Sequence, residues 1–266
     1  MQLQHGFLDV NGSRLFYEVA GAGVPLVLIH GTALDTRMWD DQVAVLAQHY
    51  QVVRYDRRGF GRSALPTATY SHADDLAALL AALELHHPVL LGHSSGGGVA
   101  LDFARAQPTA VRALILYESV LRGYSFAPAF SAYLGAVRTL ARQGDLVAAR
   151  ERWLEPLAAQ LGDAPEAVEQ LQQMAQTYSG WHWFNDDGER AASGSAELPF
   201  DRLGMPTLIV VGERTVADMQ RIAAILEREI PQARRVEVAQ GGHLANMQFP
   251  AAFNQAILAF LAACGV

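Results

Sequence analysis

The sequence predicts an α/β protein whose central sheet is mostly parallel and carries helices on both faces. Three observations predict this class. Short apolar runs alternate with longer segments of helical period, two alternating runs at the start flank Asn11-Gly12, and the alternation lapses between about 120 and 200. Because parallel strands need crossover connections that pack on the sheet, the alternation favours a sheet covered on both sides.

The elements follow in order along the chain. The runs 6–10 and 13–19 flank Asn11-Gly12 and predict a β-hairpin, which would give the sheet an antiparallel edge. The later elements are short apolar strands and longer periodic helices: strands at 25–30, 51–56, 88–93, 111–118, 206–212 and 233–239, and helices at 38–48, 73–85, 96–106, 219–229 and 251–263.

The segment 120–199 is helical in period and contains no convincing strand. We therefore expect a helical cap inserted before the last strands, with 1–119 and 200–266 forming the core. The cap carries the tryptophans Trp153, Trp181 and Trp183. Its aromatic residues are typical of a buried cap core, and a ligand cage is the alternative.

Composition excludes several classes of function. The 266 residues carry a formal charge of −7, so no basic face is expected for nucleic acid. No apolar stretch reaches the roughly 18 residues of a membrane span, and the start MQLQHGFLDV lacks a cationic and apolar leader. The single cysteine, Cys264, has no partner for an internal disulfide. We expect a soluble, cytoplasmic protein with a small-molecule substrate, and a homo-oligomeric state stays open.

The most specific motif is Gly92-His93-Ser94-Ser95-Gly96, which fits G-x-S-x-G between a predicted strand and a predicted helix. A serine on such a sharp turn is lifted out of the sheet, and the small flanking residues let the turn close. The pattern predicts Ser94 as a nucleophile, and the alternative is a glycine-rich turn without chemistry. It fits neither a P-loop nor a dinucleotide fingerprint, so no bound nucleotide is predicted.

With its HG turn at 30–31, YDRRGFGRS (55–63), GHSSGG (92–97) and GGHLANMQFPAAFN (241–254), the chain resembles the α/β-hydrolase superfamily along essentially its whole length. It is most similar to small cofactor-free esterases, enol-lactonases and haloperoxidase-like perhydrolases. The resemblance implies the α/β-hydrolase fold, no cofactor and no metal. It also implies an oxyanion hole made by the backbone N–H groups of Thr32 and Ser95.

His243 follows the last predicted strand and two glycines, where the resembled family places its general base. A serine hydroxyl needs such a base because it is a weak nucleophile at neutral pH. The order along the chain, with the serine at mid-chain and the histidine far downstream, is that of the family. We therefore expect His243 to act on Ser94, and a solvated loop histidine is the alternative.

The usual position of the acid departs from the family pattern. The resembled family carries an aspartate three residues after the strand that ends at Gly212, and Thr215 stands there. Thr215 and Asp218 have the spacing of a helix-start capping box, which would explain both residues without catalysis. Threonine can accept a hydrogen bond from imidazole but supplies no negative charge.

Three carboxylates are candidates to replace the missing aspartate. Glu118 ends a predicted strand from which some members of the family donate the acid, and it is the leading candidate. Asp218 and Glu213 are weaker candidates, because the capping box explains the first and the second precedes the expected position. The remaining alternative is that no acid supports the histidine.

The motif YDRRGFGRS predicts a structural turn in which Asp56 accepts hydrogen bonds from loop amides. A phosphate site there is the weaker alternative. Taken together, the motifs predict a serine hydrolase that cleaves a small, largely apolar ester or lactone. The alternatives are a lyase, cyclase or perhydrolase with the same pocket, and a degenerate ligand-binding protein, which Thr215 motivates.

Overall fold

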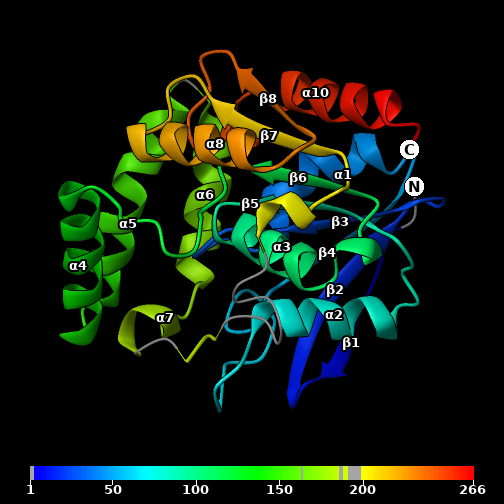
Figure 1. Cartoon of the computed structure of the whole chain (residues 1–266). Coiled ribbons are helices and arrows are strands. Elements are labelled where there is room, and N and C mark those ends of the chain that lie inside the picture. Colours follow the sequence, from blue (N-terminus) through cyan, green and yellow to red (C-terminus); the bar gives the residue numbers. More distant parts are fainter. Residues whose placement is uncertain (1–2, 163, 186–187, 191–198) are drawn as a thin grey trace.

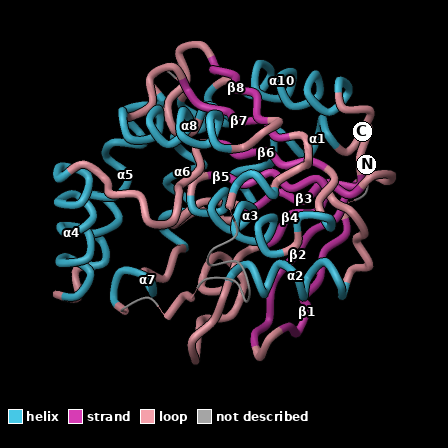
Figure 2. The backbone as a smooth tube through the Cα atoms, viewed as in Figure 1, coloured by secondary structure: helices cyan, strands magenta, loops and turns pink. Residues whose placement is uncertain are grey.

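An eight-stranded sheet forms the centre of the computed structural model, which describes residues 3–162, 164–185, 188–190 and 199–266 (Figures 1 and 2). The strands lie in the order β1-β2-β4-β3-β5-β6-β7-β8. Their bounds are β1 Gln4–Val10, β2 Ser13–Ala20, β3 Pro25–Ile29, β4 Gln51–Tyr55, β5 Val89–His93, β6 Ala113–Tyr117, β7 Thr207–Gly212 and β8 Ala233–Val238. Strands β3 to β8 pair in parallel, which confirms the predicted mostly parallel sheet.

The first two strands form the predicted hairpin. Val10 pairs with Ser13, and the two residues between them, Asn11 and Gly12, have φ angles of 47° and 69°. Such positive φ angles belong to the turn type that matches the twist of the flanking strands. β2 then pairs antiparallel with β4, so the hairpin forms the antiparallel edge of the sheet.

Helices cover both faces of the sheet, as the alternation of strands and helices predicts. One face carries α2 His72–Ala82, α3 Ser95–Ala106 and α8 Ala217–Glu229, and the other carries α1 Asp40–Leu46 and α10 Pro250–Ala263. Every residue of β5, β6 and β7 is buried, which explains why these strands are continuous apolar runs. No helix of the described residues is long and apolar enough to cross a membrane.

Four helices lie between β6 and β7, in the segment that the sequence analysis interprets as a cap. They are α4 Pro128–Arg142, α5 Leu146–Leu161, α6 Pro165–Thr177 and α7 Trp181–Phe184, and Figure 1 shows them gathered at one side of the sheet. We call them the inserted helices. Val137, Ala141, Ala149, Tyr178 and Trp183 form their own buried cluster, which also contacts Ala33 and Phe60 of the sheet domain. Residues 163, 186–187 and 191–198 of this segment lie outside the described part of the chain.

Candidate active site

Ser94 occupies the turn between β5 and α3, as the G-x-S-x-G motif predicts. Its φ and ψ angles are 52° and −119°, a conformation that a residue with a side chain rarely adopts. A Cβ atom on Gly92 would lie 2.3 Å from the carbonyl oxygen of Gly96, and one on Gly96 would lie 2.3 Å from that of Ile29. Only glycine fits these two positions, so the motif holds Ser94 in its strained turn.

The two residues predicted for the oxyanion hole lie side by side. Ser95 begins α3, where the first backbone N–H groups have no partner within the helix and the helix dipole favours negative charge. Thr32 follows β3, and its hydroxyl donates a hydrogen bond to Oγ of Ser95 at 2.9 Å. The next residue, Ala33, has a φ angle of 57°, so the loop turns sharply beside the serine.

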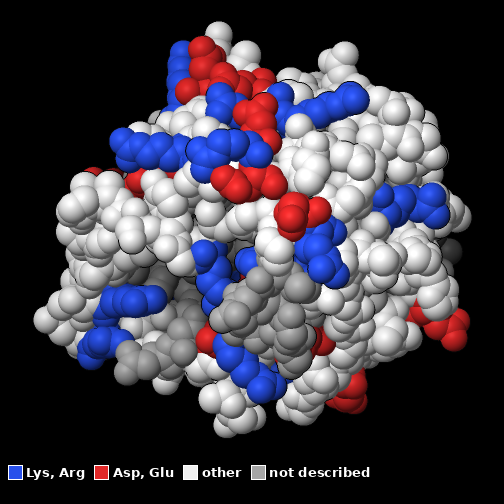
Figure 3. All heavy atoms as spheres, viewed as in Figure 1, with Lys and Arg blue, Asp and Glu red and all other residues white. Residues whose placement is uncertain are grey.

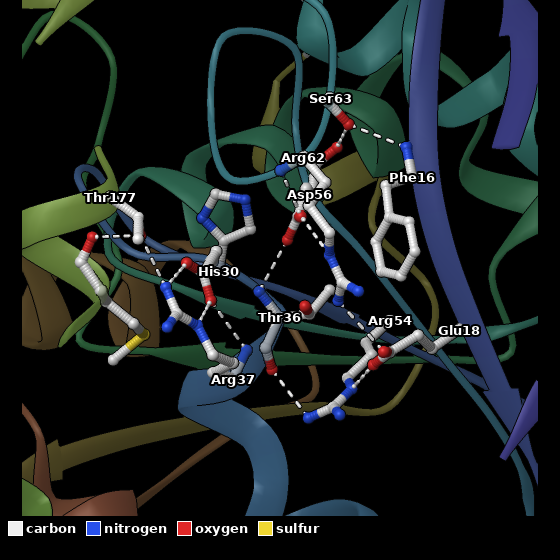
Figure 4. Close-up of polar contacts among 12 residues, drawn as sticks. Phe16, Glu18, His30, Thr36, Arg37, Arg54, Asp56, Arg62, Ser63 and Thr177 are labelled. Atoms are coloured by element: carbon white, nitrogen blue, oxygen red, sulfur yellow. Dashed lines mark hydrogen bonds and ion pairs between the residues drawn. The ribbon is translucent and has the colours of Figure 1, made fainter. Parts of the chain in front are cut away.

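A buried polar network holds the loop that carries Thr32 (Figure 4). Asp56 accepts hydrogen bonds from the backbone N–H groups of Thr36 and Arg62, each at 2.8 Å. His30 accepts the backbone N–H of Arg57 at 2.9 Å through Nε2. Burial raises the pKa of Asp56 to about 6. These contacts agree with the predicted structural role of Asp56 in the turn.

His243 lies in the loop between β8 and α9 Ala245–Gln248, and three side chains fix its backbone. Its carbonyl oxygen accepts hydrogen bonds from the hydroxyl of Tyr117 and from Nε2 of His93, both at 3.0 Å. Its N–H donates to Oε1 of Gln160 at 2.7 Å, and Gln160 belongs to α5. The imidazole remains 19% exposed, so it is positioned by its backbone and still accessible.

Glu118 is the carboxylate that the structure brings to His243. Its Oε2 accepts a hydrogen bond from Nδ1 of His243 at 3.1 Å and another from the Thr215 hydroxyl at 2.6 Å, and its Oε1 accepts the N–H of Gly212 at 2.7 Å. The Glu118 side chain is fully buried, and its φ angle of 47° is strained. The residue at the expected acid position is therefore a hydrogen-bond donor to the carboxylate that faces the histidine.

The predicted capping box of Thr215 and Asp218 is wrong. Helix α8 begins at Ala217, and its N-cap residue is Val216, whose side chain has no polar atom to make a capping bond. The Thr215 hydroxyl donates to Glu118 instead. Asp218 instead accepts hydrogen bonds from the Tyr124 hydroxyl at 2.9 Å and from a backbone N–H just before α4. Glu213 is exposed and binds a backbone N–H of the loop after β8. Asp218 and Glu213 thus bind groups other than His243.

Two adjoining cavities meet at Ser94, and we call them the two lobes of the site; His243 lines the first of them. The apolar lobe has a volume of about 310 Å³, and its walls include Leu34, Phe130, Tyr133, Trp153, Leu157 and Met219. The second lobe, of about 210 Å³, shares Ser94, Thr32 and Trp153 with the first. Figure 3 shows a hollow beside the inserted helices. The rings of Trp153 and Trp183 lie 5.8 Å apart, between centroids, with their planes tilted by 49°, and Trp153 also borders both lobes.

The other histidines near the serine are buried and neutral. Burial lowers the pKa of His30, His72 and His93 well below the usual range for histidine. The ring of His93 lies 4.7 Å from that of His243, between centroids, and His93 also lines the apolar lobe. Among the described residues, no cluster of three or more His, Cys, Asp or Glu side chains is arranged to hold a metal ion.

Sequence reasoning missed three residues of this site. Tyr117 is the last residue of an apolar strand, and Gln160 is one of many polar residues on a helix, so neither carries a local signal of its contact with His243. Arg57 was interpreted only as part of a turn, yet its guanidinium donates to Oγ of Ser95 at 2.8 Å. The doubled arginine in YDRRGFGRS was the available signal.

Comparisons with known proteins agree with this architecture. A family model described as the alpha/beta hydrolase family matches residues 26–256. A thermophilic esterase from Thermogutta terrifontis is 28% identical, with a TM-score of 0.82 over 99% of this chain and 100% of that one. A hydrolase from Pseudomonas aeruginosa is 27% identical, with a TM-score of 0.82 over 97% and 98% of the two chains. The non-heme chloroperoxidase of Streptomyces lividans is 41% identical over 117 residues, which are 41% of this chain and 42% of that protein. Since the family model covers most of the chain, this protein belongs to the alpha/beta hydrolase family.

Proposed function

We propose that the protein is a serine hydrolase that cleaves a small ester or lactone of substantial apolar character through an acyl-enzyme on Ser94. One observation carries this proposal. Ser94, on a strained turn, and His243, hydrogen-bonded to the buried Glu118, line the same cavity. A nucleophile, a base and a group that orients the base are the parts that acyl transfer by a serine requires.

In the first half of the proposed reaction, Oγ of Ser94 attacks the carbonyl carbon while Nε2 of His243 takes the hydroxyl proton. Glu118 accepts the bond from Nδ1–H, which leaves Nε2 as the proton acceptor and stabilises the imidazolium that forms. The carbonyl oxygen becomes an oxyanion, and the backbone N–H groups of Thr32 and Ser95 bind it. Collapse of this intermediate expels the alcohol, which takes the proton from His243.

In the second half, a water molecule attacks the acyl-enzyme and His243 again takes and returns the proton. The inserted helices contribute Phe130, Tyr133 and Trp153 to the apolar lobe, and these side chains limit the water around the reacting carbonyl. The volumes of the two lobes together fall in the range of small-molecule sites, about 300 to 1,000 Å³. The substrate is therefore a small molecule with an apolar part.

Glu118 also favours an active enzyme over a degenerate ligand-binding protein. The absence of an aspartate at position 215 motivates the ligand-binding alternative, but a carboxylate does contact Nδ1 of His243. Thr215 adds a hydrogen bond to that carboxylate, so its role is to hold the acid. A protein that had lost its chemistry would have no need for this buried arrangement of charge and donors.

A fluorophosphonate probe tests the proposal directly, because such probes phosphonylate only an activated serine. We expect one adduct on Ser94, located by peptide mass spectrometry, and none in the Ser94→Ala variant. Hydrolysis of a series of 4-nitrophenyl esters and of lactones then measures activity. Absence of both the adduct and hydrolysis in folded protein would support the ligand-binding alternative instead.

A second candidate function is acyl transfer to hydrogen peroxide, which the similarity to a non-heme chloroperoxidase favours. In that reaction peroxide replaces water in the second half and the product is a peracid. Peracid formation is measured by the oxidation of bromide in the presence of acetate and peroxide.

Product analysis with the same lactones would reveal a lyase or cyclase, because neither reaction adds water.

Three expectations from the sequence are retained as part of this proposal. They are a cytoplasmic location, a small-molecule substrate with no nucleic-acid or membrane partner, and a division into a core (1–119 and 200–266) and a cap (120–199). Fractionation of cells and limited proteolysis of the purified protein would test the first and the last. The oligomeric state follows from light scattering.

A further inference from the structure

The second lobe of the cavity, which we call the basic lobe, carries charge where the apolar lobe carries none. Its charged residues are Arg57, Arg138 and Glu189, set among aromatic side chains such as Phe60 and Phe126. Figure 3 shows blue basic atoms beside the hollow in this face. Ser94 lies on both lobes, so a carbonyl group at the serine would have an apolar surface on one side and the arginines on the other.

Arg57 is a buried cation whose hydrogen-bonding capacity is only partly used. It is 2% exposed, its Nη2 donates to the neutral hydroxyl of Ser95 at 2.8 Å, and its guanidinium lies 4.6 Å from the centre of the Phe60 ring. Its Nε has no hydrogen-bonding partner among the described residues. Burying a cation with an unused donor is costly unless an anion joins it.

Among the described residues, Glu189 is the one carboxylate that lines the basic lobe, and it also faces another cation. Its Oε1 lies 3.5 Å from Nη2 of Arg122, which is outside the lobe. Glu189 thus divides its charge between Arg122 and the lobe. Arg138, from the exposed side of α4, adds a second cation at the mouth. Of the described lining residues, two arginines therefore carry positive charge, and Glu189 carries a negative charge that it shares with Arg122.

We infer that the basic lobe binds a carboxylate of the substrate, so that the preferred ester has an apolar group on one side of the scissile bond and a carboxylate on the other. Arg57 supplies donors at the base of the lobe, and Arg138 supplies charge at its mouth. This inference rests on the proposed function, because it describes the ester that Ser94 attacks. A charge-assisted pair with an arginine is stronger than a neutral hydrogen bond and selects planar anions.

The test compares matched esters that differ in one charge. Mono-4-nitrophenyl glutarate and 4-nitrophenyl pentanoate have acyl chains of equal length, and 4-carboxyphenyl butyrate and phenyl butyrate place the difference on the leaving group. The charge preference is the kcat/KM of the anionic ester divided by that of its neutral partner. We expect Arg57→Gln to lower one of the two charge preferences about 10- to 100-fold. Arg138→Gln should lower the same preference about 3- to 10-fold, because an exposed charge is screened by solvent.

Two further variants separate this effect from a general loss of activity. Glu189→Gln removes the shared negative charge and should raise the charge preference. Arg228→Gln removes a charge from the exposed face of α8, away from the cavity lining, and should not change it. Arg57 also holds Ser95, so Arg138→Gln keeps the test valid if Arg57→Gln does not fold. The inference is overturned if Arg57→Gln and Arg138→Gln both still hydrolyse the neutral esters and both keep the charge preference unchanged.

A binding measurement tests the basic lobe even if the protein hydrolyses no ester. In that case the proposed function is refuted, and the inference about the lobe is tested separately. Calorimetric titration of the Ser94→Ala protein with monobutyl glutarate measures the affinity for an anionic ester without hydrolysis. We expect it to bind more tightly than butyl pentanoate. Arg57→Gln should remove most of the difference, and Arg138→Gln a smaller part of it. Equal affinities for the two esters would contradict the inference.

Discussion

Replacing Thr215 with aspartate installs the acid at its usual family position, and we expect the change to impair the protein. The Thr215 hydroxyl lies 2.6 Å from Oε2 of Glu118, so the new carboxylate would meet one that is already there. Two unit charges 4 Å apart repel each other by about 4 kcal/mol at an effective dielectric constant near 20. Two carboxylates that share a site raise the pKa of one of them strongly.

The repulsion gives the Thr215→Asp variant a characteristic pH dependence. Because the folded pair holds a proton that the unfolded chain releases, the variant loses stability as the pH rises through the raised pKa of the pair. We expect the free energy of unfolding to fall by up to about 4 kcal/mol at pH 8.5 and by much less at pH 5. Urea unfolding at both pH values measures this. Thr215→Asn, which removes the hydroxyl without adding charge, is the matched control.

Ester hydrolysis by the same variants tests which carboxylate supports His243. Displacement of Glu118 by about 1 Å in Thr215→Asp should lower kcat about 100-fold. Glu118→Gln should lower it about 10⁴-fold, as expected when the acid of a triad is lost. Adding Thr215→Asp to Glu118→Gln should restore part of the rate. A faster Thr215→Asp enzyme together with an unaffected Glu118→Gln enzyme would refute this account of the acid.

Three further predictions concern the groups around the site. Gln160→Ala leaves the N–H of His243 without its acceptor and should lower kcat up to about 10-fold, whereas Gln160→Glu should retain the rate, both measured with a 4-nitrophenyl ester. Burial lowers the pKa of His30, His72 and His93, so the folded protein is less stable below about pH 6.5, by about 1.4 kcal/mol for each histidine and each pH unit. Asp56, whose pKa is raised to about 6, has the opposite effect and offsets one of the three histidines. Urea unfolding between pH 7 and 5 measures the slope. Arg58→Met leaves the buried carboxylate of Asp75 without its two-bond partner and should destabilise the fold by about 3 to 5 kcal/mol in chemical denaturation, and a cost below 1 kcal/mol would contradict the pairing.

The centre of the sheet was predictable because burial on both faces leaves a signal in β5, β6 and β7. Runs such as those of β5 and β6 are largely apolar, and the glycines around Ser94 mark a turn where backbones approach closely. The motif and its neighbours therefore predicted the serine turn. These are local features, and a single sequence displays them directly.

The acid was harder to predict because its contacts join distant parts of the chain. Glu118 and Thr215 are 97 residues apart and meet because β6 and β7 are neighbours in the sheet. The strained φ of Glu118, which no motif indicates, accompanies this placement. The capping box failed for the same reason, since a tertiary contact engaged the hydroxyl that the local pattern assigned to the helix.

Because the proposed acid, Glu118, follows β6, the turn after β7 does not need to supply a carboxylate to His243. Glu213, Arg214 and Val216 are exposed there, and exposed turns accept substitutions and insertions more readily than strands do. Val216 also borders the apolar lobe. Substitutions at Val216 can therefore reshape that wall while the residues of the proposed catalytic site stay as they are.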